Sequence, residues 1–114
     1  MSRDETMYLS DIAKSCEKVS RFTAGLTQSD LKADEKTYDA VVRNLEILGE
    51  AAKHISDDLR EQLPDIEWQK VAGFRDILAH AYFGIDDDIL WDIVQNKVPQ
   101  LAKAISTFFN GKQS

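Results

Sequence analysis

The stretch TYDAVVRNLEILGEAAKHI, residues 37–55, decides the fold that this chain is expected to adopt. Apolar side chains recur there every three or four residues, the spacing that gathers them on one face of an α-helix. They are Val41, Leu45, Leu48, Ala52 and Ile55. Asp34 is expected to cap this helix, which is predicted over about residues 35–55. Gly49 costs about 1 kcal/mol against alanine inside a helix, and it therefore indicates that a second helix comes close.

The same periodicity continues toward the N-terminus. Ser2 and Glu5 have the spacing of a capping box, and an apolar stripe behind them reaches about Ala24, where Gly25 is expected to end the helix. The stripe consists of Tyr8, Ile12, Cys16, Val19 and Phe22. Residues 26–34 are predicted to form a loop with about one helical turn.

Two more helices are expected after residue 55. A short one begins at Ser56, followed by two acids that favour a first turn, and it stops at Pro64. Asp65 is then predicted to cap a helix over about residues 66–83, which Gly84 ends. Its buried stripe is Trp68, Val71, Phe74, Leu78 and Ala81.

The last predicted helix follows three consecutive acids, Asp86, Asp87 and Asp88. We expect these acids to form a charged first turn and a solvated loop. The apolar side chains of this helix are Leu90, Val94, Val98, Leu101, Ile105 and Phe108. Pro99 should kink it, because the proline ring removes one hydrogen bond and clashes with the turn before it.

These segments predict an all-α fold, an antiparallel four-helix bundle with an additional short helix, in a single domain over residues 1–114. A length of 114 residues suits one domain. Five glycines and two prolines are few for a loop-rich or all-β fold. No segment alternates with the period of two that a strand requires.

Composition favours a soluble protein of the cytoplasm. No apolar run approaches the ~20 residues of a membrane span, and the start of the chain has no secretory signal. The one cysteine, Cys16, excludes an internal disulfide and a cysteine-rich zinc site. The net charge of −6 argues against a broad nucleic-acid surface, because lysine and arginine neutralise phosphates.

Metal and cofactor sites are not expected. The two histidines, His54 and His80, are too far apart in sequence to share a helical turn, and no metal-binding motif or glycine-rich phosphate loop occurs. His54 follows Glu50 by four residues, so a contact within one helix explains it without a function. Cys16 lies on an apolar stripe and is expected to be buried and inert.

One segment, residues 73–84, groups side chains that carry chemistry. Arg75, His80 and Tyr82 fall within eight residues of an otherwise apolar helix. Arginine binds phosphate with a permanent charge, and histidine exchanges protons near neutral pH. Together they suffice for RNA cleavage without a metal, in which the 2′-hydroxyl attacks the adjacent phosphate.

Helix geometry limits how one copy of the segment could act. Five residues separate Arg75 from His80, which places them about 140° apart around an ideal helix. Long side chains at a fraying helix end could close that gap, or a second copy of the chain could complete the site. The second solution predicts a homodimer with two copies of the segment in one cleft.

At these residues the chain resembles the HEPN superfamily, and within it the HepT-like toxins of two-gene toxin–antitoxin modules. The match is to R-x-x-x-x-H-x-Y, here Arg75, His80 and Tyr82. It extends to residues 39–52, to Trp68 with residues 71–75, and to residues 82–86, within a frame that runs from about residue 4 to 105.

The resemblance implies an all-α homodimer that acts as a metal-independent endoribonuclease toxin on RNA, with tRNA or mRNA as candidate targets. Arg75 and His80 carry over as catalytic residues, and no cofactor is implied. Tyr82 carries over as the residue to which an MntA-like nucleotidyltransferase antitoxin attaches AMP, which would place an anion beside Arg75. Possible supporting residues in the matching frame are Asp76, Arg43, Asn44 and Glu50.

Two other functions stay open from the residues alone. The chain could be a non-catalytic helical module that binds nucleotides or partners a nucleotidyltransferase, or a structural helical protein with Arg75 and His80 in interface salt bridges. RNA cleavage in the presence of EDTA separates the enzyme from both. In the enzyme, a dimer would double Arg75 in one cleft and make the potential locally positive on an acidic protein.

Overall fold

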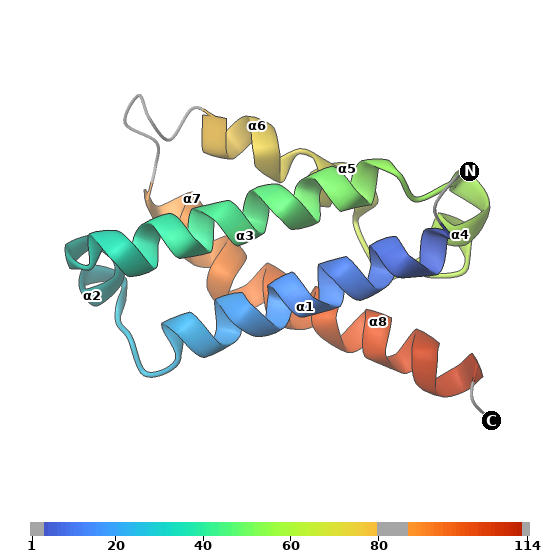
Figure 1. The fold of residues 1–114 in the computed structure, drawn as a ribbon, viewed down its shortest axis with the longest axis horizontal. Coiled ribbons are helices and arrows are strands. Elements are labelled where there is room, and N and C mark those ends of the chain that lie inside the picture. Colours follow the sequence, from blue (N-terminus) through green and yellow to red (C-terminus); the bar gives the residue numbers. More distant parts are fainter. Residues whose placement is uncertain (1–3, 80–86, 113–114) are drawn as a thin grey trace.

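The computed structural model describes residues 4–79 and 87–112, and within these ranges all regular structure is helical (Figure 1). The longest helices are α1 (Glu5–Thr23), α3 (Glu35–Lys53) and α8 (Val98–Lys112). Helices α1 and α3 run side by side in opposite directions. The prediction of an all-α fold is therefore confirmed.

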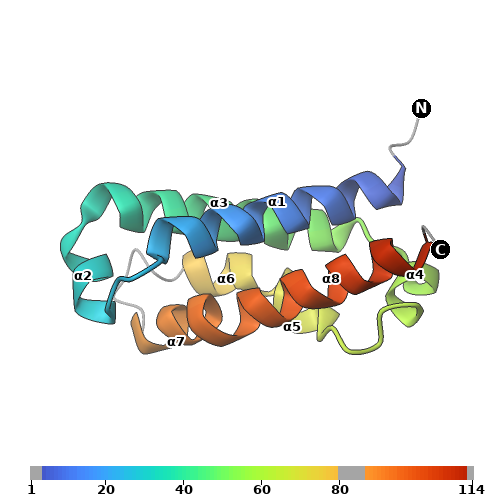
Figure 2. The same ribbon diagram turned by 90° about the horizontal axis from the view of Figure 1, so that it is seen from below.

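The remaining helices are short. They are α2 (Gln28–Ala33), α4 (Asp57–Glu61), α5 (Trp68–Ala72), α6 (Phe74–Ala79) and α7 (Asp87–Asp92), with a π-helix at Ile93–Lys97. Figure 2 shows two layers, with α1 and α3 in one and α5 to α8 in the other. The second layer is more segmented than the predicted four-helix bundle, an arrangement that stays a prediction.

The ends of the first helices follow from local hydrogen bonds. Asp4 caps α1 by accepting from the backbone N–H of Thr6 at 2.9 Å, whereas Ser2 of the predicted capping box lies outside the described residues. Gly25 takes the left-handed conformation, with φ of 77°, two residues after the end of α1, as predicted. Asp34 caps α3 by accepting from the N–H of Thr37 at 3.1 Å, also as predicted.

The helix predicted over residues 66–83 is interrupted. Helix α5 ends at Ala72, Gly73 is its C-cap, and α6 begins at Phe74. Glycine is a weak helix former, and the N–H of Asp76 bonds the Gly73 carbonyl at 3.0 Å to start a new turn. The N-cap is Glu67 and not the predicted Asp65. Residues 80–83 of the predicted helix lie outside the described residues.

Pro99 changes the hydrogen bonding of the last helical run. The π-helix at Ile93–Lys97 ends directly before α8, whose second residue is Pro99. Since proline has no N–H to donate and crowds the carbonyl four residues earlier, a wider turn accommodates it. The distortion that the sequence predicts at Pro99 is thus a π-helical turn on its N-terminal side.

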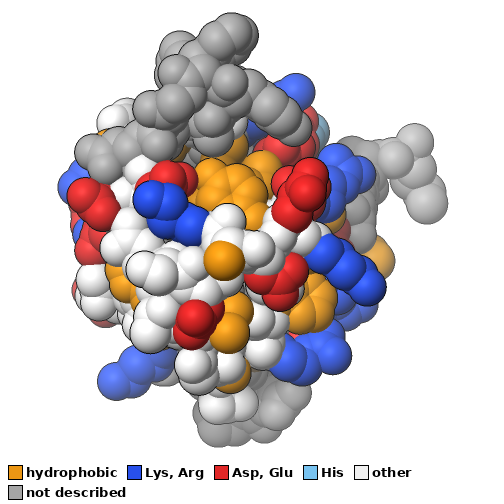
Figure 3. All heavy atoms as spheres, turned by 90° about the vertical axis from the view of Figure 1, so that its left-hand side faces the viewer, with side chains coloured by type: hydrophobic (Ala, Val, Ile, Leu, Met, Phe, Trp, Pro, Cys, Tyr) orange, Lys and Arg blue, Asp and Glu red, His pale blue; other side chains and the backbone are white. Residues whose placement is uncertain are grey.

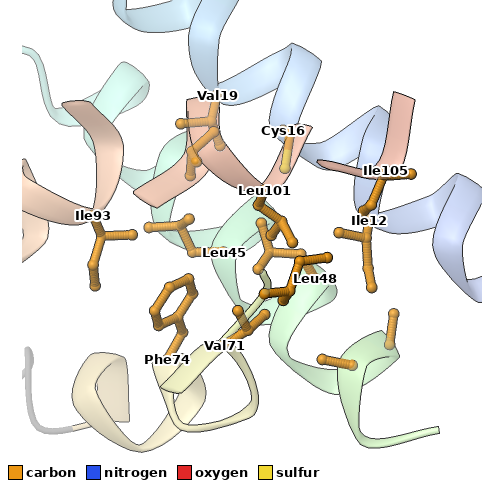
Figure 4. Close-up of a cluster of buried hydrophobic side chains, with 14 of the residues drawn as sticks. Ile12, Cys16, Val19, Leu45, Leu48, Val71, Phe74, Ile93, Leu101 and Ile105 are labelled. Carbon is orange, nitrogen blue, oxygen red and sulfur yellow. The ribbon is translucent and has the colours of Figure 1, made fainter. Parts of the chain in front are cut away.

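The two layers meet in one cluster of buried apolar side chains (Figure 4). Helix α1 contributes Ile12, Cys16 and Val19, and α3 contributes Leu45 and Leu48. From the other layer, α5, α6, the π-helix and α8 contribute Val71, Phe74, Ile93, Leu101 and Ile105. Burial of these stripes follows the predicted helical periodicity and stabilises the packing of the layers.

Arg60 closes the C-terminal end of α3. Its guanidinium donates to the carbonyls of Ala52 at 2.9 Å, in the last turn of α3, and of Ile55 at 3.1 Å, two residues past the end of the helix. The same guanidinium lies 5.7 Å from the ring of Trp68, whose indole N–H donates to the Leu63 carbonyl at 3.3 Å. The connection between α3 and α5 is held by these contacts.

Two of the three consecutive acids hold α7 against the first layer. Asp87 accepts from the Tyr38 hydroxyl at 3.2 Å and pairs with Lys32 at 3.4 Å, and Asp88 accepts from the Gln28 amide at 2.7 Å. Burial and the nearby Asp87 carboxylate raise the pKa of Tyr38. These acids are therefore more than the solvated first turn that the sequence indicates, while Asp86 lies outside the described residues.

The surface at this end of the molecule mixes charges of both signs. Figure 3 shows lysine and arginine interspersed with aspartate and glutamate around small apolar areas. Among the described side chains of this face, no continuous basic surface forms. No described helix is both long enough and apolar enough to cross a membrane.

Cys16 is fully buried, and desolvation raises the pKa of its thiol to about 12. Since the thiolate is the reactive form, we expect a disulfide-exchange reagent at pH 8 to label the folded protein roughly a thousandfold more slowly than the unfolded one. Absorbance of the released thiol, followed with and without denaturant, measures both rates. Fast labelling of the folded protein would contradict the burial of this thiol.

Candidate active site

The backbones of α3 and the α5–α6 segment come close at Gly49. A Cβ atom at this position would lie 3.4 Å from the carbonyl oxygen of Val71 and 3.5 Å from the backbone nitrogen of Arg75. The close helix approach that Gly49 predicts is therefore confirmed. Glu50 is the next residue of α3, so this contact brings its side chain near that of Arg75.

Arg75 and Glu50 form an ion pair between α6 and α3. The Nη1 atom of Arg75 donates to Oε2 of Glu50 at 2.8 Å. The pair is open to solvent, with 56% of the Arg75 side chain and 49% of the Glu50 side chain exposed. A substrate can therefore reach the guanidinium while the carboxylate holds it from one side.

The Glu50 carboxylate also faces His54, one turn further along α3. Its Oε1 atom lies 3.8 Å from Nε2 of His54, the contact within one helix that the sequence predicts. The His54 ring stacks on Tyr8 of α1, with ring centroids 4.7 Å apart and an angle of 10° between the planes. Arg75, Glu50, His54 and Tyr8 thus form a connected row across α6, α3 and α1.

A cavity of about 470 Å³ lies along this row. Besides those four side chains, it is lined by Asp11, Arg43, Glu46, Ile47 and Ala51. Arg43 is 73% exposed and lies 3.9 Å from Glu46 on the same helix. Two guanidinium groups, three carboxylates and two stacked rings therefore share one open cavity, which we call the α1–α3–α6 cavity.

The structure brings together some of the predicted site residues and not others. Arg75, Glu50 and Arg43 line the α1–α3–α6 cavity. Asn44 is buried outside it, and its amide donates to the Ala40 carbonyl of its own helix at 2.8 Å. Asp76 is exposed in the first turn of α6 and does not line the cavity.

The other two motif residues cannot be placed. His80 and Tyr82 lie outside the described residues, so their roles stay predictions from the sequence. The sequence reasoning missed Tyr8 and Asp11 of α1, which line the cavity. The sequence signal for them is weak, because both fit the ordinary pattern of an amphipathic helix. Only the packing of α3 beside α1 brings them to the cavity.

A larger cavity of about 930 Å³ lies on the other side of α6. Apolar side chains dominate its walls, among them Phe74, Ile77, Ile89 and Phe108. Arg75 does not line it. The cationic side chains of the larger cavity are Lys70, Lys97 and Lys103, whereas the smaller α1–α3–α6 cavity contains the motif residue Arg75 and is therefore the better candidate for an active site.

Within residues 4–79 and 87–112, no group of three or more histidine, cysteine, aspartate or glutamate side chains is arranged to hold a metal ion. This holds also for the three carboxylates of the α1–α3–α6 cavity. The side chains that the cavity does present are cationic, anionic and aromatic.

Comparison with known proteins gives a consistent family. A family model described as Ribonuclease HepT-like matches residues 12–108. The chain is 44% identical over 101 residues to a Thermococcus cleftensis protein named "Probable ribonuclease HepT", with 89% of this chain and 92% of the relative covered. A Methanocaldococcus jannaschii protein named as a candidate RNase is 40% identical over 103 residues, with 90% and 94% covered. No solved structure gives a significant match.

Proposed function

The chain belongs to the Ribonuclease HepT-like family, and from that premise we propose that it is a metal-independent endoribonuclease with Arg75 and His80 as its catalytic residues. The observation that carries the proposal is the exposed guanidinium of Arg75, held at the edge of an open cavity by Glu50. A catalytic cation has to be both fixed in place and accessible to phosphate, and Arg75 meets both conditions.

In the proposed reaction the 2′-hydroxyl of RNA attacks the adjacent phosphorus. The imidazole of His80 accepts the proton of that hydroxyl, and Arg75 stabilises the charge on the equatorial oxygens. The bond to the 5′-oxygen breaks, and this oxygen leaves with a proton from an acid or from water. The products are a 2′,3′-cyclic phosphate and a 5′-hydroxyl, and the step needs neither oxidant nor metal.

Glu50 is proposed to position Arg75. It engages the Nη1 end of the guanidinium at 2.8 Å, so the rest of the planar group can address a phosphate in a bidentate manner. A half-exposed ion pair adds little to folding stability. We therefore assign to Glu50 the orientation of the cation and not the stability of the fold.

The cellular role is proposed from the family resemblance. The chain acts as a cytoplasmic toxin, a homodimer with two copies of the motif in one cleft, against RNA such as tRNA or mRNA. Its antitoxin is an MntA-like nucleotidyltransferase that transfers AMP to Tyr82. An added phosphate with its nucleotide would compete with RNA for Arg75 by charge and by bulk.

The nuclease proposal predicts cleavage that depends on two side chains. Purified wild-type protein should cut a labelled RNA in the presence of EDTA, whereas Arg75→Ala and His80→Ala should each lower the rate by about a hundredfold or more. Gel analysis of the products measures the rates, and Arg21→Ala is the matched control, since Arg21 forms an exposed ion pair remote from the α1–α3–α6 cavity. Binding without cleavage would contradict the proposal and favour the non-catalytic module.

The antitoxin proposal predicts a modified tyrosine. Coexpression with an MntA-like nucleotidyltransferase should add the mass of one or more AMP groups to the wild-type protein. Tyr82→Phe should carry none, while Tyr38→Phe should be modified like the wild type because it removes the hydroxyl of a different tyrosine, one that bonds Asp87. Mass spectrometry of the intact protein decides the outcome, and AMP on Tyr82→Phe would show that the modified residue is a different one.

A further inference from the structure

We propose that the α1–α3–α6 cavity is a subsite for one nucleobase of the RNA, and that it prefers a base with an exocyclic amino group. The inference rests on the proposed ribonuclease function, because it places the base beside the phosphate that Arg75 binds. It assigns Tyr8, His54 and Glu46, to which the cleavage reaction gives no role, to the recognition of single-stranded RNA.

The aromatic part of the subsite is the stack of Tyr8 and His54. The two rings are nearly parallel, with centroids 4.7 Å apart, and both line the cavity. They are accessible from the cavity, since 49% of the His54 side chain is exposed and Tyr8 is half-buried. Unpaired RNA bases bind by stacking on such rings, so a base can extend this stack as a third ring.

The carboxylates of the cavity determine which base fits. Asp11, Glu46 and Glu50 present only acceptors when ionised, and they face the same space as the rings. Adenine, cytosine and guanine carry amino groups that donate to carboxylates, whereas uracil has a single N3–H donor flanked by two carbonyl oxygens that a carboxylate repels. An acidic wall is thus unfavourable for phosphate and for uracil but suited to an amino-bearing base.

The phosphate is assigned to Arg75, the motif residue among the two guanidinium groups of the cavity. The Glu50 carboxylate lies 2.8 Å from Arg75, and the Glu46 carboxylate lies 3.9 Å from Arg43. These carboxylates weaken the attraction of the cavity for a run of several phosphates. A phosphate on Arg75 therefore matches the positive charge of the cavity, and an amino-bearing base over the Tyr8–His54 stack matches its carboxylates. This division agrees with a net charge of −6, which disfavours contact along many phosphates.

The test measures RNA binding separately from cleavage. Fluorescence anisotropy of labelled 15-nucleotide oligo-A, oligo-C and oligo-U is recorded at low salt, in a His80→Ala background that keeps the RNA intact. We expect oligo-A and oligo-C to bind about tenfold more tightly than oligo-U, and Tyr8→Leu to weaken both by about tenfold. Tyr8→Phe keeps the ring and should retain the affinity.

The carboxylate contribution has a matched control. Glu46→Gln should reduce the preference for oligo-C over oligo-U severalfold, because the amide presents a donor in place of an acceptor. Glu17→Gln should leave the preference unchanged, since Glu17 also pairs with an arginine one turn away but lies outside the cavity. Thermal unfolding of each variant confirms that the fold is retained.

The outcomes separate the subsite from the nuclease. Equal affinity for the three oligomers, or a preference that survives both Tyr8→Leu and Glu46→Gln, would overturn the subsite even if the wild type cuts RNA. The expected preference in a protein that fails to cut RNA supports the subsite and contradicts the nuclease. Binding of a lysine- and arginine-rich peptide that Glu46→Gln weakens, with no RNA preference, would assign the cavity to a protein partner and overturn the proposal.

Discussion

The close approach of two backbones at Gly49 is the constraint on which the candidate site depends. A Cβ atom at this position would already touch the backbone of Val71 and Arg75, so only a small residue lets α3 lie this close to them. That contact fixes the separation between Glu50 on one helix and Arg75 on the other, and their ion pair follows from it. The glycine lowers the helix propensity of α3, and the close contact at this position places the guanidinium of Arg75.

The functional arrangement relies on side chains from both layers of the fold. Helix α1 supplies Tyr8 and Asp11, and α6 supplies Arg75. Helix α3 supplies the two glutamates Glu46 and Glu50 together with Arg43 and His54. The buried apolar side chains shown in Figure 4 hold these helices together. The open polar cavity lies at the surface of this packed core. Sites on packed helices place their side chains more accurately than sites on loops.

Much of the fold could be predicted from the sequence because the apolar periodicity of α1, α3 and α8 is strong. The local hydrogen bonds could be predicted less well from the sequence. The break at Gly73 and the π-helical turn before Pro99 depend on how the second layer packs, and a periodic pattern of apolar residues is the same with or without them. The sequence predicts a solvated turn at Asp87 and Asp88, because their hydrogen-bond partners lie far away in sequence, on α2 and α3.

The candidate site could be predicted only in part, for a similar reason. Arg75 and Glu50 are identifiable from a family resemblance, whereas Tyr8 reaches the site through the packing of α1 on α3, which no local pattern encodes. Asn44 matches the family frame as well as Glu50 does, but it bonds its own helix and stays outside the cavity. Sequence spacing tells which side chains share a face, and packing decides which face meets the substrate.

The most direct test of this account is the RNA cleavage rate of two variants at Gly49. A Cβ atom alone would make ordinary contacts at 3.4 and 3.5 Å, so Gly49→Ala should keep the helical fold and cut RNA at nearly the wild-type rate. The two methyl groups of valine must push α5 and α6 away, and Gly49→Val should cut at least about tenfold more slowly while its circular dichroism remains helical. Wild-type cleavage by Gly49→Val would show that the backbone approach does not set the geometry of the active site.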